Sequence, residues 1–202
     1  MHCQQPRIRL LLFSILLISP VLSAANEDKM DESVQETVVI NKVAYPVPPP
    51  WQGRELDAKE PLTAPPLVRI PTHLSAEQAK LYLLPDACTA LIEMGDAAAL
   101  DGIELKVDSS YRSGRYQKII FTRLMAEGRT FDDIIRYVAP PGYSEHMLGT
   151  VVDFAPGNWR FAETPAYQWL RTNANHFGFH ETLPESSPDG IPWESWHWQY
   201  KK

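Results

Sequence analysis

The sequence Ser-Glu-His-Met-Leu-Gly-Thr-Val-Val-Asp occupies residues 144–153, and a later Glu-Ser-Trp-His supplies Glu194 and His197. Together the two stretches hold two imidazoles and two carboxylates. A hydrolytic zinc site needs three protein ligands, a fourth position for water, and a further carboxylate close enough to take the proton of that water. We therefore expect His146, Asp153 and His197 to bind zinc and Glu194 to act as the general base.

The residues between His146 and Asp153 explain how both side chains could reach one point. Gly149 can adopt a positive φ angle, which lets the backbone turn sharply after His146. The next residues, 150–154, are β-branched or apolar apart from Asp153, which is the composition of a buried strand. We expect His146 to come from a loop and Asp153 from the strand that follows it.

Glu194 and His197 are only three positions apart, in a stretch rich in tryptophan. In an extended chain they would begin on opposite faces, because side chains alternate along a strand. A local bend is therefore needed if both are to reach the same metal ion.

The pattern Ser-x-His-x-x-Gly-x-x-x-Asp followed by Glu-x-Trp-His resembles that of the VanY-type D-alanyl-D-alanine carboxypeptidases. These are LAS-type zinc metallopeptidases, a group that also contains D-Ala-D-Ala dipeptidases, some phage endolysins and the hedgehog amino-terminal domain. The similarity covers residues 81–200, with further matches at residues 110–113 and 169–179. It implies Zn²⁺ as cofactor and a carboxypeptidase that removes the C-terminal D-amino acid from peptidoglycan stem peptides.

The chain departs from the family pattern in two places. Val151 stands where the family has alanine, which is a small change in volume. Residues 180–184 replace a segment that often carries a basic residue, and this difference concerns the choice of substrate rather than the metal site.

Three polar residues are candidates for binding the peptide. Arg112 follows an expected strand and precedes an expected helix, so its guanidinium has a rigid base from which to bind a carboxylate or a developing oxyanion. The resemblance adds Gln117 and Ser144 as partners for the peptide backbone or its terminal carboxylate. We expect Arg112 to be catalytic as well as substrate-binding.

Two other activities remain open at this point. Some relatives cut peptide cross-links, so an endopeptidase is one alternative. A zinc-containing binding module without catalysis is another, as the hedgehog relatives illustrate. Glu194 argues against the second, because a purely structural site needs no base and closes its fourth position.

The beginning of the chain predicts export. A basic start, an apolar run and a small-residue zone predict a cleaved signal peptide over residues 1–25, and the apolar run is shorter than the roughly 20 residues of a membrane span. The exported protein would lie in the periplasm or cell-wall space. An uncleaved signal anchor that tethers it to the membrane is the alternative.

Residues 26–71 are rich in proline, and composition favours a spacer there, followed by a zinc carboxypeptidase domain over residues 72–202. An arm that packs on the domain, with Trp51 as its anchor, is the second interpretation. The formal net charge of −6 argues against nucleic acid as a partner, because phosphate backbones are bound by basic surfaces. We expect peptidoglycan stem peptides as the partner, no stable membrane insertion after signal cleavage, and a monomer.

The periodicity from residue 72 onward predicts an α+β fold: a small antiparallel sheet with helices around it and the zinc site at strand ends and loops. Helices are expected from residue 76 to about 101, from 113, from 130 to 138 and from about 164 to 175. Strands are expected over residues 103–107 and 151–154. His73, His176 and His180 match no motif position and are interpreted as surface or structural, and Cys88 as a small buried apolar residue.

Overall fold

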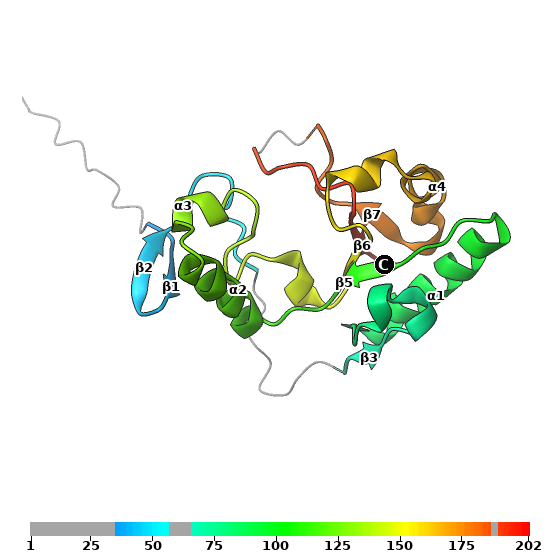
Figure 1. Ribbon diagram of the computed structural model, residues 1–202, viewed down its shortest axis with the longest axis horizontal. Helices are drawn as coiled ribbons and strands as arrows, with labels where there is room; N and C mark the ends of the chain where they lie inside the picture. The colour runs from blue at the N-terminus through cyan, green and yellow to red at the C-terminus, as the bar shows by residue number, and fades with distance from the viewer. Residues whose placement is uncertain (1–34, 57–65, 187–189) are drawn as a thin grey trace, which may run out of the picture. The chain divides into compact units, whose positions relative to one another are not determined.

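A computed structural model describes residues 35–56, 66–186 and 190–202 of the chain (Figure 1). The expected signal peptide, residues 1–25, lies outside the described residues. None of the helices in the described part is both long enough and apolar enough to cross a bilayer.

The centre of the fold is a four-stranded antiparallel sheet with the order β5-β6-β8-β7. Its strands are β5 (Val107–Ser109), β6 (Val151–Phe154), β7 (Phe179–Glu181) and β8 (His197–Tyr200). The helices α1 (Pro85–Leu100) and α4 (Pro165–Asn173) pack with this sheet around one apolar core. The predicted α+β class with a small antiparallel sheet is confirmed.

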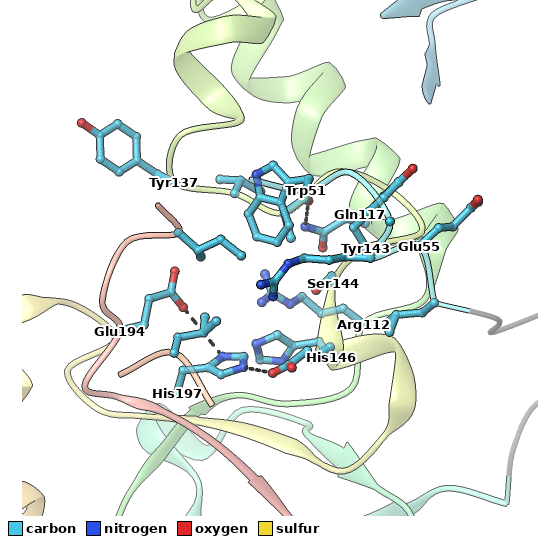
Figure 2. Close-up of a pocket in the computed structure, with 18 residues that line it drawn as sticks. Trp51, Glu55, Arg112, Gln117, Tyr137, Tyr143, Ser144, His146, Glu194 and His197 are labelled. Atoms are coloured by element: carbon cyan, nitrogen blue, oxygen red, sulfur yellow. Dashed lines mark hydrogen bonds and ion pairs between the residues drawn. The ribbon is translucent and has the colours of Figure 1, made fainter. Parts of the chain in front are cut away.

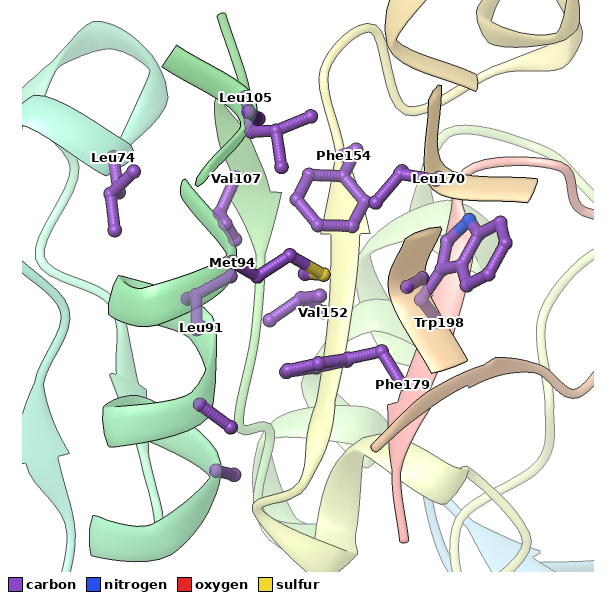
Figure 3. Packing of buried hydrophobic residues seen from close by; sticks show 14 of the residues in the cluster. Leu74, Leu91, Met94, Leu105, Val107, Val152, Phe154, Leu170, Phe179 and Trp198 are labelled. Atoms are coloured by element: carbon purple, nitrogen blue, oxygen red, sulfur yellow. The ribbon is translucent and has the colours of Figure 1, made fainter. Parts of the chain in front are cut away.

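Alternation along β6 separates the core from the functional residues. Val152 and Phe154 point into the core beside Met94 of α1, as Figure 3 shows, and Trp198 of β8 joins them. Asp153 lies between these two core residues in sequence, so its side chain leaves the opposite face of the sheet. The same face carries His197, the neighbour of Trp198.

Three predicted helix starts are confirmed by their caps. Ser113 accepts a hydrogen bond from the backbone of Tyr116 at the start of α2 (Gly114–Ala126). Thr130 caps α3 (Phe131–Ile134), and Thr164 caps α4, each through its hydroxyl oxygen. Such caps satisfy backbone N–H groups that would otherwise lack a partner at a helix start. The helix α3 is shorter than expected and ends in a turn before Val138.

The first helix begins later than expected. It starts at Pro85 rather than at residue 76, because β4 (Tyr82–Leu83) pairs with β3 (Val68–Arg69) in between. Only a short 3₁₀ turn, Ala76–Gln78, follows Ser75, and Glu77 has a positive φ angle that ends it. The strand expected over residues 103–107 is displaced as well, since β5 begins at Val107.

Residues 35–56, called the arm below, form a packed structure. The strands β1 (Thr37–Ile40) and β2 (Val43–Pro46) make a hairpin whose turn residues, Asn41 and Lys42, have the positive φ angles of a tight two-residue connection. Val38, Ile40, Val47 and Trp51 are buried against α2, α3 and nearby loops. The spacer interpretation is therefore wrong for residues 35–56. Burial of apolar side chains orders this segment despite its prolines, and it forms the packed arm.

Cys88 is a free cysteine on the buried side of α1, as expected, with 4% of its surface exposed. Burial raises the pKa of its thiol, so the side chain stays neutral.

Candidate active site

Asp153 and His197 are direct neighbours across the two central strands. They are register partners in the β6–β8 ladder, and Nδ1 of His197 lies 3.0 Å from Oδ1 of Asp153. Opposed residues on one face of an antiparallel pair bring their side chains together. The sheet pairing itself therefore brings these two predicted ligands into contact, although they are far apart in sequence.

His146 reaches the same point from a 3₁₀ turn, Glu145–Leu148, that ends at Gly149. Gly149 has a φ angle of 70°, the left-handed conformation expected for the sharp turn into β6. A Cβ atom there would also lie 3.1 Å from Cγ of Leu84. Nε2 of His146 is 3.1 Å from the other carboxylate oxygen of Asp153, Oδ2.

The three side chains have the donor set of a cation site. All three are buried, and one ligand atom from each lies within 4.8 Å of the others. Nδ1 of His146 is 2.7 Å from the carbonyl oxygen of Ser110, which can only accept, so Nδ1 carries the proton and Nε2 is a bare lone pair. Nε2 has no hydrogen-bond partner among the described residues, yet it faces a carboxylate oxygen. Two acceptors at this distance fit a metal ion between them.

Charges around the site also favour a cation. Burial alone would raise the pKa of Asp153, but His146 and His197 outweigh it and hold that pKa well below its usual range. Burial would lower the pKa of His197, yet hydrogen bonds to Asp153 and Glu145 raise it to about 10. The carboxylates thus stabilise a positive charge at this point, and burial lowers the pKa of His146, which keeps that ring neutral.

Glu194 is brought to the site by the local bend that its spacing requires. The backbone N–H of His197 donates to the carbonyl of Glu194 at 2.9 Å, which closes a tight turn just before β8. Oε2 of Glu194 lies 3.7 Å from Nδ1 of His197 (Figure 2). Burial raises the pKa of Glu194 to about 7, with further contributions of both signs from neighbouring charges. A carboxylate with this pKa can both take up and release a proton near neutral pH.

Glu145 also belongs to this site, although sequence reasoning gave it no role. Its Oε2 lies 2.9 Å from Nε2 of His197 and accepts a 2.6 Å hydrogen bond from the hydroxyl of Thr182. The signal that could have found it was its position beside His146, within the quoted motif. A carboxylate on the far nitrogen of a ligating histidine orients the ring and selects its tautomer.

Arg112 lies next to the three predicted ligands. Its Nη2 is 3.7 Å from Oδ2 of Asp153, and its backbone N–H donates to the carbonyl of His146 at 3.3 Å. Nε of Arg112 is buried without a hydrogen-bond partner among the described residues. The guanidinium therefore keeps donors available beside the candidate metal site.

Gln117 and Ser144 lie in the wall of the same pocket and are almost fully buried. Nε2 of Gln117 donates to the carbonyl of Ala139 at 2.7 Å, which fixes the orientation of the amide. Its Oε1 has no partner among the described residues, so it is an acceptor available to a ligand.

One pocket of about 410 Å³ brings together the candidate catalytic and binding residues apart from Asp153. It is lined by Arg112, Gln117, Ser144, Glu145, His146, Glu194 and His197. Figure 2 shows Glu194 and His197 at one end, Arg112 in the middle, and Trp51, Gln117 and Tyr143 beyond it. The arm contributes five lining residues: Trp51, Gly53, Arg54, Glu55 and Leu56. Sequence reasoning missed four of these. His73, His176 and His180 do not line this pocket, in agreement with their interpretation as surface or structural residues.

Comparison with known proteins gives one family match. Residues 80–202 match the family model of VanY, D-alanyl-D-alanine carboxypeptidase. A D-alanyl-D-alanine carboxypeptidase of Enterococcus faecalis is 32% identical over 120 residues, which cover 54% of this chain and 45% of that protein. The chain spans about half the length of the curated relatives it matches.

Solved structures give the same picture. The structure of the LD-carboxypeptidase LdcB, which reveals the molecular basis of peptidoglycan recognition by that protein, has a TM-score of 0.64 at 26% identity. The match covers 82% of this chain and 84% of LdcB. VanYB in complex with D-alanine-D-alanine has a TM-score of 0.53 at 27% identity and covers 69% of this chain and 79% of its own.

Proposed function

This chain belongs to the VanY family of D-alanyl-D-alanine carboxypeptidases, and from that premise we propose that it is a zinc-dependent carboxypeptidase acting on peptidoglycan stem peptides. It removes the C-terminal residue of the peptide. The names of two relatives refer to D-alanyl-D-alanine, which supports a D-amino acid at this position. The observation that carries the proposal is the buried group of His146, Asp153 and His197 with Glu194 beside it. The pocket that Arg112 shares with them offers a place for the peptide end.

The residues fit zinc, and each has a separate task. His146, Asp153 and His197 would hold the zinc ion, which would supply a Lewis acid for the scissile carbonyl and would lower the pKa of water to roughly 7. Glu194 takes the proton from the attacking water and then passes it to the leaving amine. Its pKa of about 7 suits both steps, because neither protonation state is strongly favoured at neutral pH.

The peptide is held by the polar groups in the middle of the pocket. Arg112 binds the free C-terminal carboxylate with its guanidinium donors, one of which is buried and unpaired within the described structure. Oε1 of Gln117 accepts an N–H of the peptide, because its own amide nitrogen already donates to Ala139. Ser144 offers its hydroxyl from the same wall.

The location of the enzyme follows from its substrate. We propose that the protein is exported, acts as a monomer in the periplasm or cell-wall space, and does not bind nucleic acid. The composition of residues 1–25 supports export through a cleaved signal, and the formal charge of −6 supports the absence of a nucleic-acid partner.

The decisive experiment is incubation of the purified protein with pentapeptide and tetrapeptide stems, with products identified by mass spectrometry. We expect loss of one C-terminal residue from at least one stem, dependence on zinc, and loss of turnover in Glu194→Ala. Glu93→Ala, which removes an exposed carboxylate from α1, is the matched control and should cut normally. Cleavage of cross-linked stems as fast as free ones would instead identify an endopeptidase.

A further inference from the structure

We infer that the arm, residues 35–56, is a functional wall of the substrate pocket that restricts it to peptides ending in a free carboxylate. The inference rests on the proposed carboxypeptidase activity and extends it to a segment outside residues 80–202, the part of the chain that matches the family model. It assigns to Arg54 a role beside Arg112 in binding the carboxylate.

The arm is held in place by its own apolar core. Trp51 is 8% exposed and donates from Nε1 to the backbone carbonyl of Ile135 at 3.1 Å. Tyr45 stacks on Phe131 with ring centroids 4.5 Å apart. Contacts of large apolar side chains such as these stabilise the packed position of the arm. The end of the arm is therefore a defined surface at the pocket.

Glu36 joins the arm to the pocket wall opposite. Its Oε1 accepts the backbone N–H of Gly53, and its Oε2 accepts the hydroxyl of Tyr143, both at 2.8 Å. The backbone N–H of Leu56 donates to the carbonyl of Gly142 at 2.8 Å. Residues 53–56 thus run beside residues 142–144, the segment that leads into the turn carrying His146.

The position of Arg112 decides which end of the peptide meets the arm. Arg112 contacts Asp153, and Figure 2 shows the Arg112 side chain between His146 and Trp51. A peptide with its scissile bond at the candidate metal site and its carboxylate at Arg112 has its end facing the arm. A chain that continued past this carboxylate would run into residues 51–56.

Arg54 lines the same pocket and gives it a second guanidinium. Two guanidinium groups can together supply more donors to one carboxylate than a single group, and such charge-assisted bonds are the stronger kind. Glu55 lines the same pocket with the opposite charge, and Gly142 lies near its carboxylate. If the pocket recognises charge, removal of the Arg54 charge should weaken binding of the free peptide and removal of the Glu55 charge should not. If the two side chains only pack, both changes should act in the same direction.

The test uses the full chain and one stem peptide in two forms, with a free and with an amidated C-terminus. We expect Arg54→Ala to raise the KM for the free peptide roughly tenfold to hundredfold, as for loss of a hydrogen bond to a charged group. The preference for the free over the amidated peptide should fall by a similar factor, while zinc content stays at one per chain. Glu55→Gln should leave binding of the free peptide equal or stronger, because it removes a repelling charge.

Two further variants separate local binding from loss of the fold. Glu36→Ala removes the link between Gly53 and Tyr143 and should also reduce the preference for the free peptide. Val39→Thr changes an exposed residue on the outer face of the same hairpin and should leave KM, preference and thermal stability unchanged.

Failure of the inference differs from failure of the proposed function. An active enzyme whose preference is unchanged in both Arg54→Ala and Glu36→Ala would overturn the role of the arm alone. A wild-type protein that cuts neither form of any stem peptide would overturn the carboxypeptidase proposal and this inference with it.

Discussion

Glu145 and His197 are bound to each other on the side of the imidazole that faces away from Asp153. Oε2 of Glu145 lies 2.9 Å from Nε2 of His197, while Nδ1 of the same ring lies 3.0 Å from Asp153. A cation that replaced the proton on Nδ1 would leave the other proton on Nε2, where Glu145 accepts it, and the lone pair on Nδ1 would then be directed at the candidate metal position. Ser110 does the same for His146 in the opposite tautomer, through its backbone carbonyl.

Removal of the Glu145 carboxylate should therefore weaken metal binding more than it weakens the fold. We expect Glu145→Ala to reduce zinc affinity about 10–100-fold, as is typical when such a partner of a ligating histidine is lost. Glu145→Gln should keep most of the affinity, because its amide oxygen can still accept from Nε2. Competition with a chromogenic chelator measures the affinity, and equal affinity in Glu145→Ala and Glu93→Ala would contradict this role.

The three predicted ligands should hold one zinc ion per chain. We expect metal analysis of the double variant His146→Ala, His197→Ala to give almost no zinc, since two of the three donors in the buried group are gone. His176→Ala removes an exposed histidine outside the pocket and should keep full occupancy. Full zinc content in the double variant would place the metal elsewhere.

Glu194 should act on the reaction and not on the metal. Glu194→Gln should retain zinc and fold but lose about 10²–10⁴-fold in kcat, the usual contribution of a general base. Since burial raises the pKa of Glu194 to about 7, the carboxylate is protonated below this pH and cannot accept a proton. The pH profile of kcat/KM should therefore rise with pH through a midpoint near or below 7, because a bound cation would lower that pKa further.

A normal kcat in Glu194→Gln would assign the base to another residue. The rising limb of the pH profile offers an independent check, because it should disappear from whatever activity the variant retains.

Arg112 should act through the free carboxylate of the peptide. We expect both Arg112→Ala and amidation of the peptide to depress kcat/KM strongly, and the two changes combined to cost little more than either alone. Changes that remove the same contact do not add, and a double-mutant cycle measures this coupling. If Arg112→Ala lowered turnover equally for free and amidated peptides, the guanidinium would be acting on the oxyanion instead.

The grouping of the candidate metal-site residues could be predicted because their chemistry is concentrated in short, closely spaced motifs. Asp153 and His197 meet through the pairing of β6 with β8. The composition of residues 150–154 predicts the strand that carries Asp153, whereas no strand was expected over residues 197–200. The sharp turn at Gly149 and the bend between Glu194 and His197 followed from spacing alone, and both are present.

The arm and the first helix could not be predicted as well, because distant contacts determine them. Trp51 donates to Ile135, 84 residues away in sequence, and nothing local indicates that partner. Proline content pointed to a spacer, and the apolar run Val38-Val39-Ile40 does not show in sequence that Val38 and Ile40 are buried while Val39 is exposed. The sequence predicts a helix from residue 76, and nothing in residues 76–84 shows that Tyr82 and Leu83 pair with the distant strand β3.

The pairing of Asp153 with His197 across β6 and β8 ties the candidate metal site to the correct fold of the sheet. A slip of one residue between these strands would turn Asp153 toward the apolar core and expose Val152 or Phe154, so the ligands can assemble in a single register. An ion bound there also closes a loop between residues 44 positions apart, which the unfolded chain cannot hold in that geometry. Zinc bound as proposed would select chains in the native register over misregistered ones, and the melting temperature should rise with free zinc concentration.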